Sequence, residues 1–420
     1  MVQENIMLSI DIGTTKICAV MAEYDESRNF TIIGVGDSHS KGLRRGMVVD
    51  IDKTINSIEL AVEECKKMAG VDDVDGVIVG IAGDHIRSLN SHGVIAIGQI
   101  SDDYMGETGT VKGADVDRVL NRAETITLAP DRQILHVEPQ EFIVDDQSGI
   151  KDPIGMVARR LEAKAHIVHG ASTSVQNLTN CIRGSNMEVQ SIVLESLASS
   201  FAVLDDDERE LGVALVDIGG GTSDIIVFFQ GGIKHTGIVP LGGDSITNDI
   251  AIIFRTSRDI AESIKIKHGC ANASMVSRED IFSIEGIGGR PPKDATREEL
   301  ARVVQPRMKE ILHHVKGEIH KSDCYGQLTG GIVLTGGGSL LEGLQELAEE
   351  IFELPVKIGY PNVFGGLAES VNNPIYSTAI GLLKYELKLD RAHAVRIREK
   401  KRFSIRNIIQ PIIDWFEELF

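Results

Sequence analysis

Residues 212–229 read GVALVDIGGGTSDIIVFF, and residues 7–21, MLSIDIGTTKICAVM, follow the same pattern. Each stretch is an apolar run rich in β-branched residues, then Asp-Ile-Gly, then small or hydroxylated residues, then a second apolar run. This pattern predicts a β-hairpin with a polar turn. One such stretch is more often an ordinary glycine-rich hairpin than a binding site, but two copies in one chain indicate a shared function.

The two turns combine the residue types that bind phosphate and a hard cation. Glycine has no Cβ, so its backbone N–H can approach phosphate oxygens closely, and threonine hydroxyls can donate to the same oxygens. Lys16 adds a positive charge, while Asp11 and Asp217 suit Mg²⁺, which often meets carboxylates through its own water. Two such turns facing each other predict a site for a nucleoside triphosphate. The candidate phosphate ligands are Gly13, Thr14, Thr15, Gly219, Gly220, Gly221 and Thr222.

A third glycine turn follows a short apolar run in GGIVLTGGGSLLEGLQELAEEIF, residues 330–352. The pattern predicts a buried strand, a turn and a helix, with Ser339 and Glu342 forming an S-x-x-E capping box. Helix N-termini attract anions, so this turn also suits phosphate. The P-loop pattern GxxxxGK[ST] is not met, because Leu344 stands where the lysine is required, and a GxGxxG pattern is absent. The candidate ligands here are Gly336, Gly337, Gly338 and Ser339.

Together, DIGTTK, VDIGGGTSD and VLTGGGSLLEGL resemble the phosphate and adenosine motifs of the actin, hexokinase and heat-shock chaperone ATPase superfamily. IVLESLASSFAVL resembles its first connecting helix, NPIYSTAIGLLKYE its second, and DIAESIKIKHG the segment that meets adenosine in the bacterial actins. With the GIGGRPP loop and the terminal Trp-Phe segment, the chain is similar along nearly its whole length to the FtsA family of bacterial cell-division proteins.

This resemblance implies an α/β, actin-like ATPase fold of two duplicated sheet-and-helix domains with ATP in the cleft between them. It also implies an inserted subdomain and a C-terminal amphipathic helix. The expected divisions are domain I at 1–83, 166–190 and 361–390, the inserted subdomain at 84–165, domain II at 191–249 and 315–360, its small subdomain at 250–314, a basic tether at 391–404 and the amphipathic helix at 405–420.

The resemblance also implies roles for single residues. Glu262 and Lys265 are expected near the ribose and base of ATP. Glu195, in VLES, resembles the carboxylate that contacts the Mg²⁺ shell or the attacking water, which would allow slow hydrolysis. The alternative is a helix-capping or surface glutamate. Nucleotide binding as an assembly switch, with weak ATPase activity or none, is therefore the expectation.

Partners follow from the same resemblance. The inserted subdomain would contact later division proteins and neighbouring protomers in a filament, unless it is merely decorative. The small subdomain would receive the C-terminal tail of the tubulin-like protein FtsZ. The basic residues placed for that tail are Arg297, Arg302, Arg307 and Lys309, for each of which a solvated helix face is an equal alternative.

Other classes of the superfamily fit less well. A sugar kinase needs a catalytic aspartate over a bound hydroxyl, and none can be assigned outside the phosphate turns. A heat-shock chaperone carries a substrate domain after the second connecting helix, and too few residues remain here. The alternative that stays open is another weakly hydrolysing actin-like protein, of pilus assembly or cell shape.

Composition narrows the partners further. The net charge of -19 argues against nucleic acid, because phosphate backbones require clustered cations. The five cysteines form no CxxC pair, which suits inert thiols in a reducing compartment. Neither a signal peptide nor an apolar run long enough to span a bilayer is seen. We therefore expect the protein to stay in the cytoplasm. The resemblance to the FtsA family further implies a peripheral position on the cytoplasmic face of the cell membrane, at the division site.

The chain ends in RNIIQPIIDWFEELF, residues 406–420. At helical spacing its apolar side chains share one face and its polar side chains fill the other. The segment could be a core helix, a docking peptide or a membrane anchor. The cation-rich tether before it favours the anchor, because cations beside an apolar helix match an anionic bilayer surface. The predicted membrane contacts are Ile405, Ile408, Ile409, Ile412, Ile413, Trp415, Phe416, Leu419 and Phe420, with Lys400, Lys401, Arg402 and Arg406.

Overall fold

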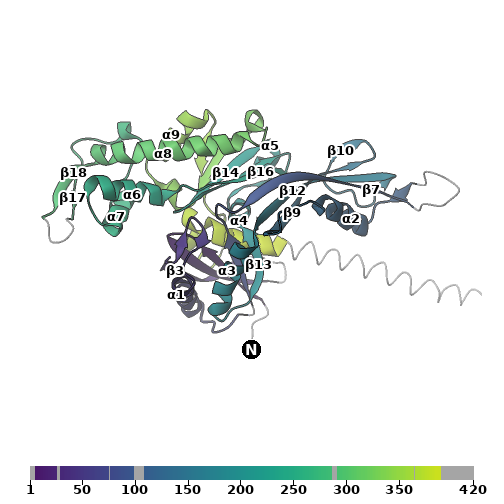
Figure 1. Cartoon of the computed structure of the whole chain (residues 1–420), viewed down its shortest axis with the longest axis horizontal. Helices are drawn as coiled ribbons and strands as arrows, with labels where there is room; N and C mark the ends of the chain where they lie inside the picture. The colour runs from purple at the N-terminus through teal and green to yellow at the C-terminus, as the bar shows by residue number, and fades with distance from the viewer. Residues whose placement is uncertain are drawn as a thin grey trace, which may run out of the picture.

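The computed structural model describes residues 5–25, 29–74, 76–98, 108–285, 291–363 and 365–388. It contains two five-stranded sheets, one per domain (Figure 1). The domain I sheet has the strand order β13-β6-β1-β2-β3, and the domain II sheet has the order β16-β15-β14-β19-β20. Their bounds are β1 Ile6–Ile12, β2 Lys16–Tyr24, β3 Phe30–His39, β6 Val77–Ile81, β13 Val189–Leu194, β14 Val213–Ile218, β15 Ser223–Phe229, β16 Gly232–Val239, β19 Ile332–Thr335 and β20 Val356–Ile358.

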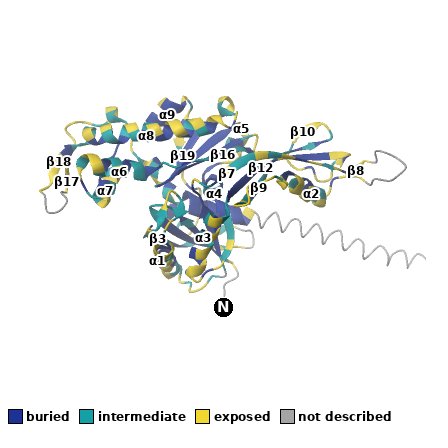
Figure 2. Cartoon of the chain, viewed as in Figure 1, coloured by how far each residue is buried: buried dark blue, intermediate teal, exposed yellow. Residues whose placement is uncertain are grey.

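The central strands of the two sheets are equivalent, as the duplicated pattern predicted. Strand β1 pairs antiparallel with β2 and parallel with β6, and β14 pairs antiparallel with β15 and parallel with β19. Every residue of β14 is buried, because helices cover both faces of the sheet. Figure 2 shows the same dark blue interior along both sheets. The predicted hairpins and the duplicated α/β architecture are thus confirmed.

Two helices lie between the sheets: α4 (Glu195–Val203) and the helix at 377–388, drawn in yellow in Figure 1. The hydrophobic core of domain I continues through both helices to Leu215 and Ile226 of domain II. At Gly381 an added Cβ would lie 1.8 Å from the Ala198 carbonyl oxygen, so only glycine permits this close contact. The domains therefore meet at two directly touching helices.

The remaining helices cover the outer faces of the sheets. Domain I carries α1 (Ile51–Ala69) and α3 (Ser172–Gly184), and the helices α6 (Gly243–Phe254), α8 (Arg297–His320) and α9 (Leu344–Phe352) pack on domain II. No helix in the described ranges is long and apolar enough to cross a membrane. The shorter elements are β4 Leu43–Arg44, β5 Met47–Val48, α5 Asp206–Leu211, η3 Tyr325–Gln327, η4 Gly337–Leu340, α10 Ala368–Val371 and η5 Pro374–Tyr376.

The inserted subdomain is a four-stranded sheet of order β10-β9-β12-β7 with α2 packed on it. Helix α2 spans Gly113–Glu124. The subdomain touches domain II through His166, whose ring nitrogens lie 2.7 Å from Asn90 Oδ1 and 2.9 Å from Thr236 Oγ1. Its elements are β7 Arg87–Ala96, β8 Gly109–Thr110, α2 Gly113–Glu124, β9 Arg132–Val144, β10 Gln147–Ile150, β11 Val157–Ala158 and β12 Arg160–Ala171.

The expected small subdomain of domain II contains α7 (Arg258–His268), η1 (Ala273–Met275), β17 (Ile281–Ile284) and β18 (Lys293–Thr296). Its expected bounds, residues 250 and 314, lie inside α6 and α8, so this division of the chain stays a prediction. The basic tether and the C-terminal amphipathic helix predicted at 391–420 lie outside the described residues.

Candidate functional site

The turns of the two equivalent hairpins face each other. An added Cβ at Gly220 would lie 2.4 Å from Thr15 Cγ2, and one at Gly221 would lie 2.4 Å from Thr14 Oγ1. Any side chain at these glycines would collide with the opposite turn. The Thr14 hydroxyl also accepts from the Gly46 N–H at 3.0 Å. The fold thus brings together two turns that lie far apart in the sequence.

The third turn packs against the end of β14. An added Cβ at Gly336 would lie 2.1 Å from Asp217 Oδ1, and the φ of +79° at Gly336 is in the left-handed region that favours glycine. An added Cβ at Gly338 would lie 2.4 Å from Ile218 Cγ2. All three glycine turns therefore converge on the ends of β1 and β14.

The predicted capping box in the third turn is wrong. Ser339 lies in η4, where its hydroxyl donates to the Gly336 carbonyl at 2.7 Å, and Glu342 pairs with Arg297. Helix α9 begins only at Leu344, because Gly343 has a φ of +71° and interrupts the helical path. The third glycine turn is a short 3-10 turn, and no α-helix starts at Ser339.

Glu262 and Lys265 both lie on α7, which is hydrogen-bonded to the start of α6 next to the second turn. The Gly243 N–H, at the start of α6, donates to the Gly219 carbonyl at 3.0 Å. The Lys265 ammonium, on α7, donates to Glu262 Oε2 at 2.7 Å, to Thr247 Oγ1 at 3.0 Å and to the Gly243 carbonyl at 3.3 Å. This network connects both predicted residues to the second glycine turn through α6.

A cluster of acidic side chains lies at the centre of the site. Asp217 Oδ2 accepts from Ser199 Oγ at 2.6 Å and from Thr378 Oγ1 at 3.1 Å. Burial raises the pKa of Asp11 to about 7, Asp217 adds to the rise and Lys16 opposes it. Burial, and then the nearby Asp11, raises the pKa of Glu195 well above its usual range. The carboxyls are near enough to oppose one another's ionisation.

Asp224 is a member of this cluster that the sequence reasoning missed. Its Oδ2 accepts from Thr222 Oγ1 at 2.8 Å, while its buried Oδ1 has no hydrogen-bond partner among the described residues. Burial raises the pKa of Asp224 to about 7, with Asp217 and Asp11 contributing. The signal was available: in the second hairpin, Asp217 and Asp224 are directly opposite each other on β14 and β15.

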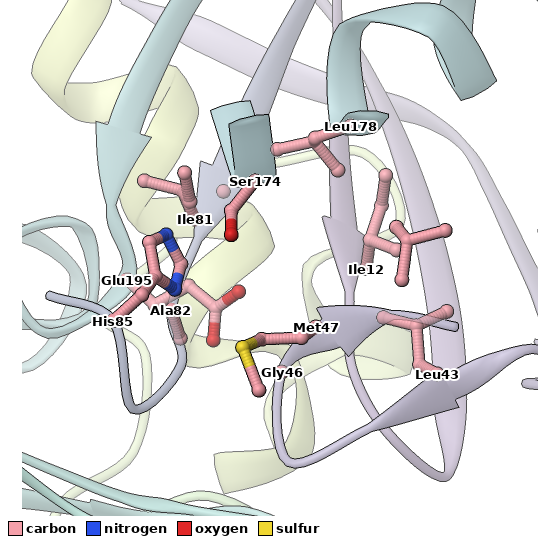
Figure 3. A pocket seen from close by; sticks show the side chains of 12 residues that line it. Ile12, Leu43, Gly46, Met47, Ile81, Ala82, His85, Ser174, Leu178 and Glu195 are labelled. Atoms are coloured by element: carbon pink, nitrogen blue, oxygen red, sulfur yellow. The ribbon is translucent and has the colours of Figure 1, made fainter. Parts of the chain in front are cut away.

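Glu195 stands at the start of α4 and points into a small pocket with His85, Ser174 and Met47 (Figure 3). It is not the cap of α4, since that position belongs to Leu194. Neither ring nitrogen of His85 has a hydrogen-bond partner in the described part of the chain. Burial, and then Arg132, lowers the pKa of His85 to about 4. The pocket is therefore lined by both a carboxyl group and a neutral imidazole.

Lys16 contacts Asp37 and Tyr376 in this structure. Its ammonium lies 2.9 Å from Asp37 Oδ1 and 4.1 Å from the centre of the Tyr376 ring, and the Tyr376 hydroxyl donates to Asp37 Oδ2 at 2.7 Å. To meet a phosphate, the lysine would have to exchange these partners.

The acidic cluster suits a cation reached through water better than a directly held one. No set of three or more His, Cys, Asp or Glu side chains in the described ranges is arranged to hold a metal ion directly. Asp11 and Asp217 nevertheless offer hard oxygen donors beside the turns, and Asp224 Oδ1 is buried without a partner. A cation that keeps its water, as Mg²⁺ does, fits such donors.

The four basic residues assigned to a partner all meet acidic residues of their own chain. Arg297 pairs with Glu342, and Arg302 lies 2.7 Å from Glu298. Arg307 donates to both oxygens of Asp249, at 2.6 and 3.1 Å, and Lys309 lies 3.6 Å from Glu350. The Arg302 side chain is 63% exposed, which makes it the most accessible of the three arginines.

The chain is similar to family models and to known proteins over most of its length. The family model described as "Cell division protein FtsA" matches residues 214–381, and that described as "SHS2 domain inserted in FTSA" matches residues 83–169. The cell division protein FtsA of Pseudomonas aeruginosa is 44% identical over 383 residues, which cover 91% of this chain and 89% of that protein. The chain belongs to the FtsA family. The resemblance seen in the sequence motifs is thereby confirmed.

Other FtsA proteins extend the match to the ends of the chain. FtsA of Escherichia coli (strain K12) is 34% identical over 422 residues, covering 99% of this chain and 98% of that protein. Among solved structures, the PilM-PilN type IV pilus biogenesis complex has a TM-score of 0.65 at 14% identity, covering 91% of this chain and 98% of that one. MreB5 of Spiroplasma citri bound to ADP has a TM-score of 0.54 at 15% identity, with coverages of 93% and 99%. These neighbours confirm the actin-like fold, and the family-model match at residues 83–169 confirms the inserted subdomain.

The raised pKa values of the acidic cluster predict a pH-dependent stability. Below its ordinary pKa of 3.8, Asp224 is protonated in both the folded and the unfolded chain. Between that pH and about 7 the unfolded chain loses a proton that the folded chain keeps, so rising pH lowers the free energy of unfolding. Asp224→Asn should therefore gain stability over the wild type as the pH rises from 5 to 8, on the order of 1 kcal/mol or about 3 °C in Tm.

Calorimetric unfolding without nucleotide at both pH values measures this difference. Asp72 serves as the control. Its carboxylate is exposed to solvent, so Asp72→Asn removes a negative charge without changing the buried acidic cluster. An Asp224→Asn variant whose advantage stays constant from pH 5 to pH 8 would show that Asp224 is already ionised in the folded protein at pH 5.

Proposed function

We propose that this protein binds Mg-ATP between its three glycine turns and uses the nucleotide as an assembly switch. The observation that carries the proposal is the meeting of the turns at Thr14–Gly221 and Thr15–Gly220, with Gly336 against Asp217. The solved structure of the similar MreB5 in complex with ADP adds support. Backbone N–H groups of the turns would bind the phosphates, and Asp11 and Asp217 would hold the water shell of Mg²⁺, which neutralises phosphate charge.

The acidic cluster favours weak hydrolysis at most. A carboxyl group that keeps its proton at neutral pH cannot accept one from an attacking water. Because burial raises the pKa of Glu195 well above its usual range, this residue is a poor base until a cation enters the site. Rapid steady-state turnover stimulated by a small sugar or an unfolded peptide would overturn this function.

The proposed cellular role is that of an FtsA protein on the inner face of the cytoplasmic membrane. It polymerises there, tethers FtsZ filaments and helps to recruit later division proteins. Family membership supports this role, as does the C-terminal sequence with its apolar face and basic tether. An acidic FtsZ tail would have to compete with the protein's own carboxylates on α8, most easily at Arg302, whose partner Glu298 is shared with Arg278. A pilus-assembly or cell-shape role is not favoured, because relatives that match nearly the whole chain are cell division proteins.

Electron microscopy on anionic lipid monolayers tests this role. The full chain with Mg-ATP should form filaments that recruit FtsZ, and an FtsZ lacking its C-terminal tail should not be recruited. A protein that stays monomeric on lipid at high concentration with ATP would contradict the proposal.

Self-association is predicted to depend on the inserted subdomain. Actin-like chains associate head to tail through heterologous contacts, which repeat without closing. Deletion of residues 84–169 removes all of the inserted sheet except the last two residues of β12. A deletion that ended at residue 164 would instead leave residues 165–171 of β12 without their partner strands. We expect the deletion to abolish filaments while calorimetry still detects Mg-ATP binding. Filaments of unchanged length in the deletion variant would contradict a role of this subdomain in assembly.

A further inference from the structure

The pocket beside Glu195 has the size and the lining of a site for one water molecule. Its cavity volume is about 10 Å³, which is room for a single water. Among the described residues that line it, the polar side chains are those of Glu195, His85 and Ser174, and the others are apolar residues or glycine. Figure 3 shows these three side chains converging. A buried water needs about two to four polar partners, and this pocket offers them.

The pocket borders the first glycine turn. Ile12, one of its lining residues, stands directly before Gly13. Gly46, another lining residue, donates its N–H to Thr14 Oγ1 at 3.0 Å. Glu195 belongs both to the pocket and to the acidic cluster, whose carboxyls interact with its charge. A water in this pocket therefore lies next to the proposed position of the phosphates.

Two glycines at the end of β6 make room for the two titratable groups. An added Cβ at Gly80 would lie 3.0 Å from Glu195 Cγ, and one at Gly83 would lie 3.0 Å from His85 Nδ1. Arg132 holds the backbone beside the ring, because its Nη2 donates to the His85 carbonyl at 2.7 Å. Packing thus fixes the imidazole, while no described residue makes a hydrogen bond to either ring nitrogen.

The chemistry of the two groups assigns them different roles toward a bound water. A neutral imidazole has one ring nitrogen with a free lone pair, which can accept a proton. A carboxyl group that keeps its own proton can donate a hydrogen bond to the water oxygen but cannot take a proton from it. None of the described lining residues is a lysine or an arginine that would favour ionised Glu195.

We propose that His85 is the base of ATP hydrolysis at this site and that Glu195 orients the attacking water as a hydrogen-bond donor. This inference rests on the proposed binding of Mg-ATP. The water oxygen forms a bond to the γ-phosphorus, and the bond from that phosphorus to the oxygen shared with the β-phosphate breaks, leaving its electron pair on ADP. The proton of the water passes to the free ring nitrogen of His85, which becomes imidazolium.

The surroundings of His85 keep this reaction slow. Burial, and then Arg132 and Arg87, oppose a positive charge on the ring, while Asp84 favours it. The imidazolium that forms during the reaction is therefore poorly stabilised. A site with this base agrees with weak ATPase activity in a protein that uses nucleotide for assembly.

Single-turnover hydrolysis of bound ATP tests the assignment. His85→Phe keeps a flat ring without a basic nitrogen, and its rate should fall at least about 100-fold. Glu195→Gln removes the rival base but keeps a hydrogen-bond donor, so it should be at least about tenfold faster than His85→Phe. The control is His314→Phe, the same change at an exposed histidine of α8, which should keep the wild-type rate. Calorimetry first establishes a saturating concentration of Mg-ATP for each variant.

Nuclear magnetic resonance of the full chain labelled with ¹⁵N-histidine gives a readout besides activity. The signal of His85 is the one that His85→Phe lacks. Without nucleotide at neutral pH, one ring nitrogen should be protonated. With Mg-ADP and aluminium fluoride, which mimics the transferred phosphoryl group, both should be protonated. Should His85→Phe not fold, His85→Asn, with a smaller side chain, replaces it in both measurements.

The outcomes distinguish this inference from the proposed function. No calorimetric binding of Mg-ATP by the wild type refutes the proposed function. Binding without any hydrolysis, or hydrolysis that His85→Phe leaves unchanged, overturns the role of His85 alone. A Glu195→Gln variant as slow as His85→Phe, or a His85 ring that stays neutral with aluminium fluoride, does the same, because Glu195 would then be the base.

Discussion

Gly337→Asp is expected to abolish binding of Mg-ATP. The substitution places a carboxylate in the third glycine turn, beside the expected position of the phosphates. Two like charges about 4 Å apart repel by about 4 kcal/mol at an effective dielectric constant near 20, which lowers affinity about a thousandfold. Isothermal titration calorimetry with Mg-ATP measures the loss directly.

A substitution at position 337 tests the electrostatic effect without damage to the fold, because a side chain can be placed there without a collision. The nearest neighbour of an added Cβ there is Ile375 Cγ2, at an ordinary contact distance of 3.5 Å. The adjacent Gly336 is unsuitable, because its positive φ and the nearby Asp217 would strain any substitution. Gly337→Ala is the matched control and should bind within a few-fold of the wild type. Unchanged affinity in Gly337→Asp would place the nucleotide elsewhere.

Removal of residues 405–420 is expected to abolish sedimentation with anionic liposomes. The segment carries nine large apolar side chains, and burying one fully is worth about 1.5 to 3 kcal/mol. Even half-burial exceeds the cost of ordering a short helix, and each tether cation adds about 1 kcal/mol near an anionic surface. Both sheets and the helices between them are built from residues before 389, so the truncated protein should stay folded and bind Mg-ATP.

Single substitutions test the apolar face itself. Trp415→Glu should lose nearly as much liposome binding as the truncation, because it places a charge among the buried side chains. Gln410→Glu adds the same charge on the polar face of the predicted helix and should keep most of the binding. A truncated protein that still sediments fully, or one that unfolds, would show that the C-terminal segment is not a membrane anchor.

Local patterns account for the parts of the fold that were predicted correctly. The alternation of apolar runs and polar turns around Asp11 and Asp217 determines each hairpin, since pairing between neighbouring strands needs only adjacent residues. The helical spacing of Ile58, Val62 and Cys65 likewise places all three on one face of α1, where they are buried. Ile51 is 42% exposed because it stands at the open end of that helix.

Conformational details within single motifs were less predictable. Ser339 and Glu342 have the spacing of a capping box, yet Gly343 adopts a left-handed conformation and delays α9 to Leu344. Glycine can adopt either conformation, so the choice depends on packing: an added Cβ at Gly343 would lie 3.0 Å from both Asn272 Cβ and Met275 Sδ. Residues distant in the sequence therefore affect what this short motif becomes.

Turn chemistry and apolar periodicity act over a few residues, so the duplicated hairpins, the three glycine turns and the apolar pattern of the C-terminal segment could be predicted from the sequence. Which of the described features meet depends on the packing of the complete fold. Asp217 joins Ser199 and Thr378, and Gly381 touches Ala198, although the partners come from different helices and sheets. Such contacts follow from how complete helices and sheets pack, and packing at that range leaves no periodic signal along the chain.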